Sequence, residues 1–263
     1  GGKYVVRGGI YNRSLDETYL DAGYYVDSAN GMYEVKAVNG AAITVNNNEE
    51  LINAINSTSV KEAKTITLAK DITLNTNDLL TLAKNSKLVV NTGIKLTINS
   101  PIDLNGTLEI NGSVDIASNG YIGNLDNILL DTNASLNYDA SLSGNSITVA
   151  KPMDMQWVAY QYMIGNDMIQ TLNITTDLDY LNAHADPIGT DETIFTGTLD
   201  GGGHTISNVK IEGSSDMALF GVANDITITN LTISNIEVKG NTARAAVLAA
   251  AASGNINVNN VDV

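Results

Sequence analysis

The chain has 263 residues, a formal net charge of −15 at pH 7 and no cysteine. This charge would repel a phosphate backbone, so we expect no nucleic-acid partner. The missing cysteine excludes disulfides and thiolate zinc sites. Because no run of 18 apolar residues occurs and only two Phe and one Trp are present, we expect no membrane insertion and a narrow core of aliphatic side chains.

The first 40 residues are rich in tyrosine and glycine. Within them, Asn30 and Gly31 stand between two β-prone runs in residues 24–35. An Asn-Gly pair tolerates the positive φ angles of a tight hairpin. We therefore predict a small Tyr-rich β unit over residues 1–40.

Residues 46–55 predict a short amphipathic helix, because Leu51, Ile52 and Ile55 recur at helical spacing behind asparagines that can cap its start. A series of triplets follows, each with two apolar residues flanking a third, mostly polar residue. The Asn-Gly pairs between some of them predict corners with left-handed backbone. The triplets begin at Ile66, Ile72, Leu80, Leu88, Leu96, Ile102, Leu108 and Val114.

Every third triplet recurs after 22, 24, 22, 20 and 18 residues, the period of a coil that holds three short strands. Antiparallel hairpins with arms of three residues would be poorly held, whereas stacked coils pair each strand above and below. The sequence thus predicts an all-β protein, a parallel β-helix (β-solenoid) with short capping helices. A first helix-capped β-solenoid is expected over residues 41–150.

A second helix is expected over residues 155–163, and strands resume after it. Residues 151–263 are therefore predicted to form a second helix-capped β-solenoid. This helix carries Trp157, Tyr160 and Tyr162. The three aromatic side chains are candidates for ligand binding. The alternative is that they anchor the helix over the open end of the solenoid, where core and backbone would otherwise be exposed.

Three asparagines in the last third of the chain, Asn208, Asn230 and Asn260, each precede an apolar-polar-apolar triplet. Equivalent side chains in successive coils lie about 4.8 Å apart. We therefore predict that these amides form a structural ladder that points inward and satisfies the bent backbone.

The stretch FTGTLDGGGHTISNVKI over residues 195–211, with ALFG at 218–221 and ITNL at 228–231, carries a family resemblance. It resembles the pectin-lyase-like right-handed β-helix surface proteins of gut bacteria, many of which bear GLUG motifs. The resemblance covers residues 155–263 well and residues 42–149 by general pattern, and an Ala-rich stretch at 245–252 replaces the usual Gly. It implies an extracellular or cell-surface location and an adhesin-like role.

Catalysis is weighed because β-helices also host polysaccharide lyases and hydrolases. Arg244, which a lyase could use as its base, has no carboxylate beside it in the sequence, and His204 follows three glycines without the Lys-Ser/Thr of a phosphate-binding loop. Asp177, Asp179 and Asp200 could act as a hydrolytic carboxylate set, although Asp also forms turns. We assign no catalytic residue.

No cofactor is expected, except that calcium could be held by the oxygen ligands of Asp177, Asp179 and Asp186. The predicted function is a secreted, non-catalytic repeat protein that mediates cell adhesion, its solenoid wall binding a host or dietary glycan or a surface protein. The alternatives are a polysaccharide lyase or glycoside hydrolase that acts on acidic glycans, and a structural stalk. Because the residues up to Val263 read as a strand, we expect the chain to continue in a longer protein or to associate end to end with another copy.

Overall fold

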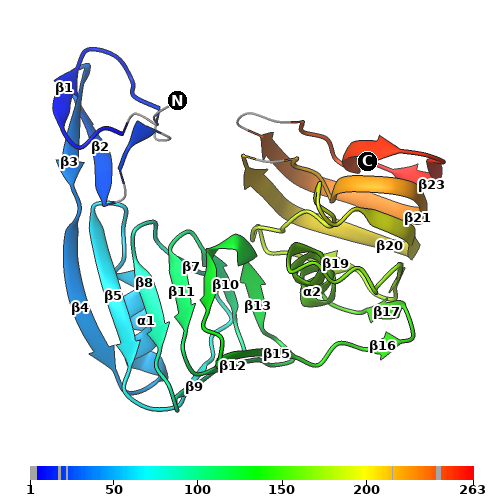
Figure 1. Cartoon of the computed structure of the whole chain (residues 1–263), viewed down its shortest axis with the longest axis horizontal. Coiled ribbons are helices and arrows are strands. Elements are labelled where there is room, and N and C mark those ends of the chain that lie inside the picture. The colour runs from blue at the N-terminus through cyan, green and yellow to red at the C-terminus, as the bar shows by residue number, and fades with distance from the viewer. Residues whose placement is uncertain (1–4, 17–18, 22, 215, 241–243) are drawn as a thin grey trace.

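The computed structural model describes residues 5–16, 19–21, 23–214, 216–240 and 244–263. Within these ranges the protein is mostly β-structure in parallel sheets, with two α-helices. Figure 1 shows two stacks of strands side by side. The first stack comprises β4 to β15, and the second comprises β16 to β23. None of the helices described is long and apolar enough to cross a membrane.

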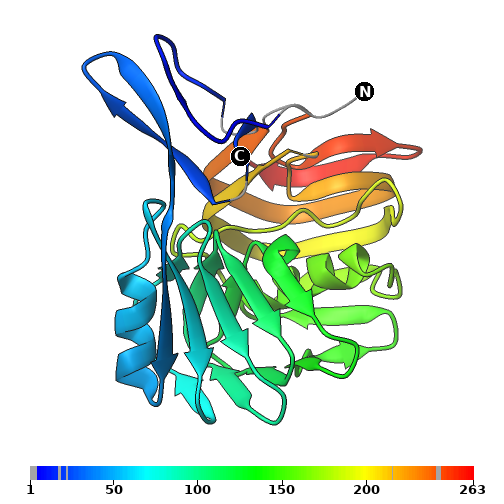
Figure 2. The ribbon, with the colours of Figure 1, turned by 60° about the vertical axis from the view of Figure 1, so that its left-hand side comes forward.

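An antiparallel sheet precedes the first stack. It consists of β1 (Gly9–Tyr11), β2 (Tyr24–Ala29) and β3 (Met32–Ala37), in the order β1-β3-β2. Asn30 and Gly31 connect β2 to β3 with φ angles of 53° and 75°, so the predicted hairpin is confirmed. Figure 2 shows the hairpin projecting beyond the first stack.

The first stack contains three parallel sheets, which the chain visits in turn. One holds β4 (Asn39–Val45), β5 (Glu62–Leu68), β8 (Lys87–Val90), β11 (Thr107–Ile110) and β14 (Ile128–Leu130). The second holds β6 (Ile72–Leu74), β9 (Lys95–Ile98), β12 (Ser113–Ile116) and β15 (Ser135–Tyr138). The third holds β7 (Leu80–Leu82), β10 (Pro101–Leu104) and β13 (Tyr121–Gly123).

The register of these sheets confirms the predicted spacing. The paired residues are Ile66 with Leu88, Ile72 with Leu96, Leu80 with Ile102, Leu88 with Leu108, and Leu96 with Val114. Each triplet buries its two apolar residues, and most leave the residue between them open to solvent, as Leu80 and Leu82 do with Thr81. Full burial of such a leucine stabilises the fold by roughly 1.5–3 kcal/mol, so the repeated pattern builds one continuous core.

Both predicted helices are present. α1 (Asn48–Asn56) starts at Asn47, whose side-chain oxygen accepts a hydrogen bond from the Glu50 amide at 2.9 Å. α2 (Pro152–Met163) starts three residues earlier than predicted. Proline is favoured in a first helical turn because its missing N–H has no partner there anyway, and Asp154 accepts bonds from the Ala150 and Lys151 amides at 2.8 and 3.0 Å.

The second stack departs from the triplet pattern. It contains β16 (Leu142–Ser143), β17 (Ser146–Val149), β18 (Thr171–Ile174), β19 (Leu178–Asp179), β20 (Phe195–Gly213), β21 (Phe220–Gly240), β22 (Ala249–Ser253) and β23 (Asn257–Asp262). All pairs except β16–β17 are parallel. β20 and β21 are long strands of 19 and 21 residues, and their pairing continues across irregular positions where the register shifts. β17, which lies before the predicted boundary at residue 150, pairs with β18 after it.

Corners of the first stack depend on glycines in Asn-Gly pairs, at Gly106, Gly112 and Gly120. The expectation of left-handed backbone is wrong here, because none of the three has a positive φ. The structure shows a different reason for glycine: a Cβ would lie 2.2–2.4 Å from a backbone carbonyl oxygen of the preceding coil. The backbone at these corners therefore passes so close to the carbonyl oxygens of an earlier corner that only glycine fits.

We expect Gly112→Ala to lower the free energy of unfolding by about 1–3 kcal/mol, because the added methyl group must displace the carbonyl oxygens of Asn91 and Ile94. Gly40→Ala is the matched control, since Gly40 has an ordinary φ and nothing lies within 4 Å of the place that its methyl group would take. Urea denaturation of both variants measures the difference. Equal effects would show that the corners are not tightly packed.

Candidate functional site

The candidate site is a cavity of about 500 Å³ where the end of the first stack meets the second. We call it the junction pocket. The loop after β13, the end of α2, residues 185–192 and the region between β20 and β21 form its walls. Six carboxylates line it, namely Asp126, Asp186, Asp191, Glu192, Glu212 and Asp216, and no Lys or Arg is found among the lining residues of the described chain. The pocket is therefore strongly acidic.

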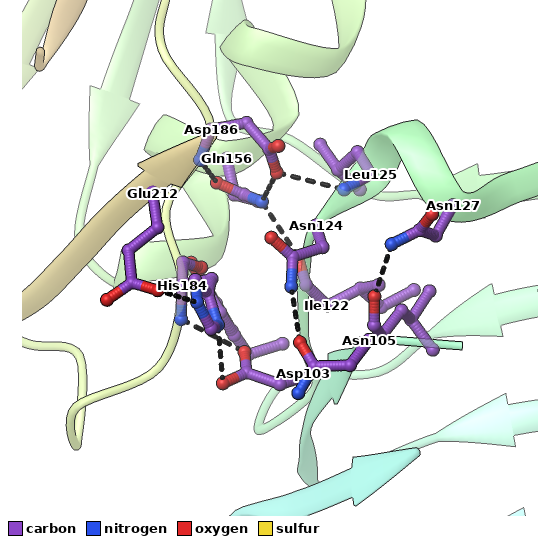
Figure 3. Close-up of polar contacts among 12 residues, drawn as sticks. Asp103, Asn105, Ile122, Asn124, Leu125, Asn127, Gln156, His184, Asp186 and Glu212 are labelled. Atoms are coloured by element: carbon purple, nitrogen blue, oxygen red, sulfur yellow. Dashed lines mark hydrogen bonds and ion pairs between the residues drawn. The ribbon is translucent and has the colours of Figure 1, made fainter. Parts of the chain in front are cut away.

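Asp186 is the most deeply set of these carboxylates. Its Oδ2 accepts hydrogen bonds from the Leu125 amide at 2.9 Å and from Gln156 Nε2. Gln156 in turn accepts from the Asp186 amide at 3.1 Å and donates to the Ile122 carbonyl at 2.9 Å, as Figure 3 shows. Burial raises the pKa of Asp186 to about 6, and the nearby Asp126 adds to this, against the opposing effect of the hydrogen bonds.

Beside the pocket, Asp103 of β10 holds His184 of the second stack. The carboxylate accepts from the His184 amide at 3.0 Å and contacts its ring Nδ1 at 3.1 Å. On the other side of the ring, Nε2 lies 3.7 Å from Glu212. The hydrogen bond with Asp103 raises the pKa of His184, while the bond from Lys239 lowers the pKa of Glu212. The close approach depends on Gly123, where a Cβ would lie 2.2 Å from Asp103 Oδ1.

This arrangement supports two kinds of chemistry. A carboxyl group with a pKa near 6 at a pocket wall can donate a proton at neutral pH. The negative potential attracts cationic or hydroxyl-rich ligands and opposes the entry of uronates. Two of the other carboxylates are partly neutralised, Glu212 by Lys239 at 2.8 Å and Asp216 by Arg244 at 2.9 Å. Arg244 has no carboxylate beside it in the sequence, and the fold supplies Asp216 from 28 residues earlier.

The structure separates the acidic residues that the sequence suggested for calcium or hydrolysis. Asp177 accepts from the Thr205 amide at 2.9 Å and contacts His204 at 3.3 Å, whereas Asp179 accepts from the Leu181 amide at 2.9 Å. Asp186 lies in the junction pocket instead. Among the residues described, no group of three or more His, Cys, Asp or Glu is arranged to hold a metal ion. Asp200 accepts from the Gly202 amide at 3.0 Å, which is the turn-forming arrangement.

The three candidate aromatic residues of α2 have different environments. Trp157 is partly exposed and lies between Tyr138 and Tyr160, with ring centroids 5.6 and 5.3 Å away. Tyr160 is 9% exposed. Tyr162 is 1% exposed and donates to the Ile169 carbonyl at 2.8 Å, so it occupies a core position.

The asparagines form two columns, not one. Asn260 donates to the Asn230 side chain at 2.9 Å, while Asn208 donates to Asp179 at 2.8 Å and accepts from Asn235 at 2.5 Å. The three predicted ladder residues have φ angles of 53–55° and are half-buried or exposed. They therefore occupy left-handed corners near the surface, and their amides do not enter the core.

The sequence pattern indicated no site role for Asp103, Gln156, His184 and Glu212. Asp103 is the middle residue of an ordinary triplet. It pairs with Thr81, the middle residue of an earlier triplet, so nothing in the pattern sets it apart. The signal available in the sequence was Gln156, a polar residue within a mostly apolar stretch of helix. In the structure it is 1% exposed.

We expect the contribution of Asp186 to the free energy of unfolding to fall as the pH rises from about 4 to 7. Carboxylates with a lowered pKa, such as Glu109 and Asp216, act in the opposite direction in the lower part of this range. The pKa of Asp186 lies near 6 in the fold and 3.8 is its ordinary value, so the folded state holds the proton in this window and ionisation above it opposes folding. The effect is at most about 3 kcal/mol and smaller where pocket solvent screens the charge. His184 acts in the same direction, because its raised pKa gives stability that is lost as the pH rises through that pKa.

Asp186→Asn should flatten most of this slope and raise stability at pH 7 relative to the parent protein. Urea denaturation at several pH values measures it. Asp139→Asn, which alters an exposed carboxylate, is the control and should keep the parent slope. An unchanged slope in Asp186→Asn would contradict the assignment.

Comparisons with known proteins give one partial likeness. The chain is 49% identical to Halomucin of Haloquadratum walsbyi over 55 residues, which are 20% of this chain and 1% of Halomucin. The chain thus matches only a small part of that protein's length. No protein-family model matches the chain. No solved structure matches it either.

Proposed function

We propose that the chain is a right-handed parallel β-helix module of the pectin-lyase-like surface-protein type, and that it acts outside the cell as a non-catalytic adhesin. The observation that carries the proposal is the register of three parallel sheets, with successive coils paired at the spacing of the sequence triplets. A stack of this kind exposes long, regular walls of polar side chains, which suit extended ligands.

The proposed extracellular location rests on the composition of the chain and on its partial likeness to a known protein. The acidic balance keeps a β-rich repeat protein soluble outside the cell. The partial likeness to Halomucin, a protein named as a mucin, points in the same direction. The ligand class follows from charge: an acidic molecule would be repelled by the protein's net charge of −15, so we propose a neutral glycan or a basic protein surface.

The purified chain should bind neutral host or dietary glycans when it is applied to a glycan array, and the signal should survive moderate salt, because neutral ligands do not depend on ion pairing. A matched array of uronate-rich glycans serves as the control and should stay empty. An array without neutral hits would remove the glycan adhesin and favour a structural stalk.

A second candidate is a glycoside hydrolase, favoured by Asp186 alone. Its raised pKa of about 6 suits a general acid, and other carboxylates share the same cavity. The charge of the junction pocket disfavours the acidic glycans that the sequence suggested as substrates. A hydrolase at this site would act on neutral or amino-substituted glycans.

We expect no turnover when neutral and acidic polysaccharides are incubated with the protein and the release of reducing ends is followed. Asp186→Asn and Asp78→Asn are tested beside the parent protein, since Asp78 is an exposed carboxylate that lines neither the junction pocket nor any other hollow described. Release of reducing ends that is lost in Asp186→Asn and kept in Asp78→Asn would overturn the non-catalytic proposal and identify the general acid.

A further inference from the structure

A second hollow lies on the opposite flank of the helix, between α2 and β15. It is an open groove of about 430 Å³ lined by Asp115, Asn137, Tyr138, Asp139 and Trp157, over Ile116 and Leu136. We call it the Trp157 groove. Its lining shares no residue with that of the junction pocket.

Trp157 interrupts a buried run in the middle of its helix. Residues 153–156 and 158–160 of α2 are all buried, whereas Trp157 remains partly exposed. Its ring and that of Tyr138 lie 5.6 Å apart at an angle of 52°, so the two faces meet at an open angle. A large aromatic side chain that stays half-open in a groove provides apolar contact area for a ligand.

The aromatic pair is held in place before any ligand arrives. Tyr138 donates its hydroxyl hydrogen to Asp154 at 2.5 Å, and Asp154 is 3% exposed and accepts bonds from the two amides just before the helix. Lys151 lies 5.2 Å above the Tyr138 ring, and Tyr160 supports Trp157 from behind at 5.3 Å. Little conformational entropy would therefore be lost in these rings on binding.

Hydrogen-bonding groups flank the rings on one side. Asn137 donates to Asp115 at 2.8 Å, which leaves its carbonyl oxygen available to a ligand donor, and Asp139 is exposed next to Tyr138. A matching ligand has an apolar C–H face for the rings and hydroxyl groups at its edge for the carboxylates and the amide. A pyranose with equatorial hydroxyls has this shape, whereas a uronate would meet the like charge of Asp139, since Lys95 lies 3.4 Å from Asp115 and offsets the charge of that carboxylate.

We propose that the Trp157 groove binds a neutral pyranose with equatorial hydroxyl groups, of the glucose or N-acetylglucosamine type, whose apolar face contacts Trp157 and Tyr138. The proposal rests on the proposed adhesin function and names its ligand class and its place in the fold. It does not involve the junction pocket.

The chain contains one tryptophan, so intrinsic tryptophan fluorescence reports on this groove alone. Titration with cellohexaose or chitohexaose should change the emission of Trp157 in a saturable way, and an equal concentration of oligogalacturonate should not. Calorimetry measures the affinity independently of the fluorophore.

Variants then separate binding from folding. Trp157→Ala should weaken binding about tenfold or more, the loss expected for about 1.4 kcal/mol of stacking, while Trp157→Phe retains an aromatic face and should lose less. Because Trp157 also packs against the core, Asp139→Ala is added: this exposed residue should weaken binding without changing the melting temperature. Tyr19→Ala, which removes an aromatic side chain that is 52% exposed in the N-terminal unit, should leave the affinity unchanged.

The outcomes distinguish this inference from the broader function. If a neutral glycan binds but the emission of Trp157 and the affinities of Trp157→Phe and Asp139→Ala do not change, the groove is wrong and the adhesin function stands. If no glycan on the array or in calorimetry binds, both fall together. Tighter binding of oligogalacturonate than of the neutral sugars would also overturn the proposal.

Discussion

The fold depends on backbone hydrogen bonds between short parallel strands that lie about 20 residues apart in the sequence. A strand of three or four residues, such as β7 or β10, has no stability by itself and is held because it pairs with strands of adjoining coils. This constraint fixes the length of each coil and brings its corners close together. It explains why Gly106, Gly112 and Gly120 meet carbonyl oxygens of the preceding coil at distances that no Cβ could tolerate.

The same constraint decides how much of the structure was predictable. In the first stack each triplet has a strict period of two and the corners are short, so the spacing of Ile66, Leu88 and Leu108 in the sequence is also their register in the sheet. In the second stack the corners lie inside β20 and β21 and add or remove residues between triplets. The predicted equivalence therefore holds for Asn230 and Asn260, because Leu231 pairs with Val261, and fails for Asn208, because Val209 pairs with Ile236.

The candidate site could not be predicted in this way, because it depends on contacts between distant residues that break no local pattern. Asp103 stands in a triplet position that is mostly open to solvent elsewhere, yet it is 4% exposed here, where His184 from 81 residues later contacts it. Burial of such a carboxylate is costly unless hydrogen bonds replace its water. The bidentate contact with His184 supplies them, and it ties the two stacks together in one relative position.

The junction pocket and the Trp157 groove both lie where the parallel sheets of the first stack end. Its three sheets end at β13, β14 and β15, whose outer edges pair with no further strand in the described part of the chain, and an open edge leaves backbone groups and core side chains without cover. β14 leaves Leu129 and Leu130 exposed by 55% and 43%. α2 covers the other two edges with adjacent residues, since Gln156 bonds the Ile122 carbonyl of β13 and Trp157 packs on Tyr138 of β15.

Neighbouring residues of a helix point about 100° apart, so one turn of α2 reaches two sheet ends at once and fills neither completely. The space left beside Gln156 is bounded by the carboxylates of the second stack, and the space left beside Trp157 is bounded by the polar residues of β12 and β15. A regular stack has no concave surface of its own, because each coil repeats the wall of the last. The junction pocket and the Trp157 groove therefore both lie at the end of the first stack, and the identity of the two capping residues sets the chemistry of each.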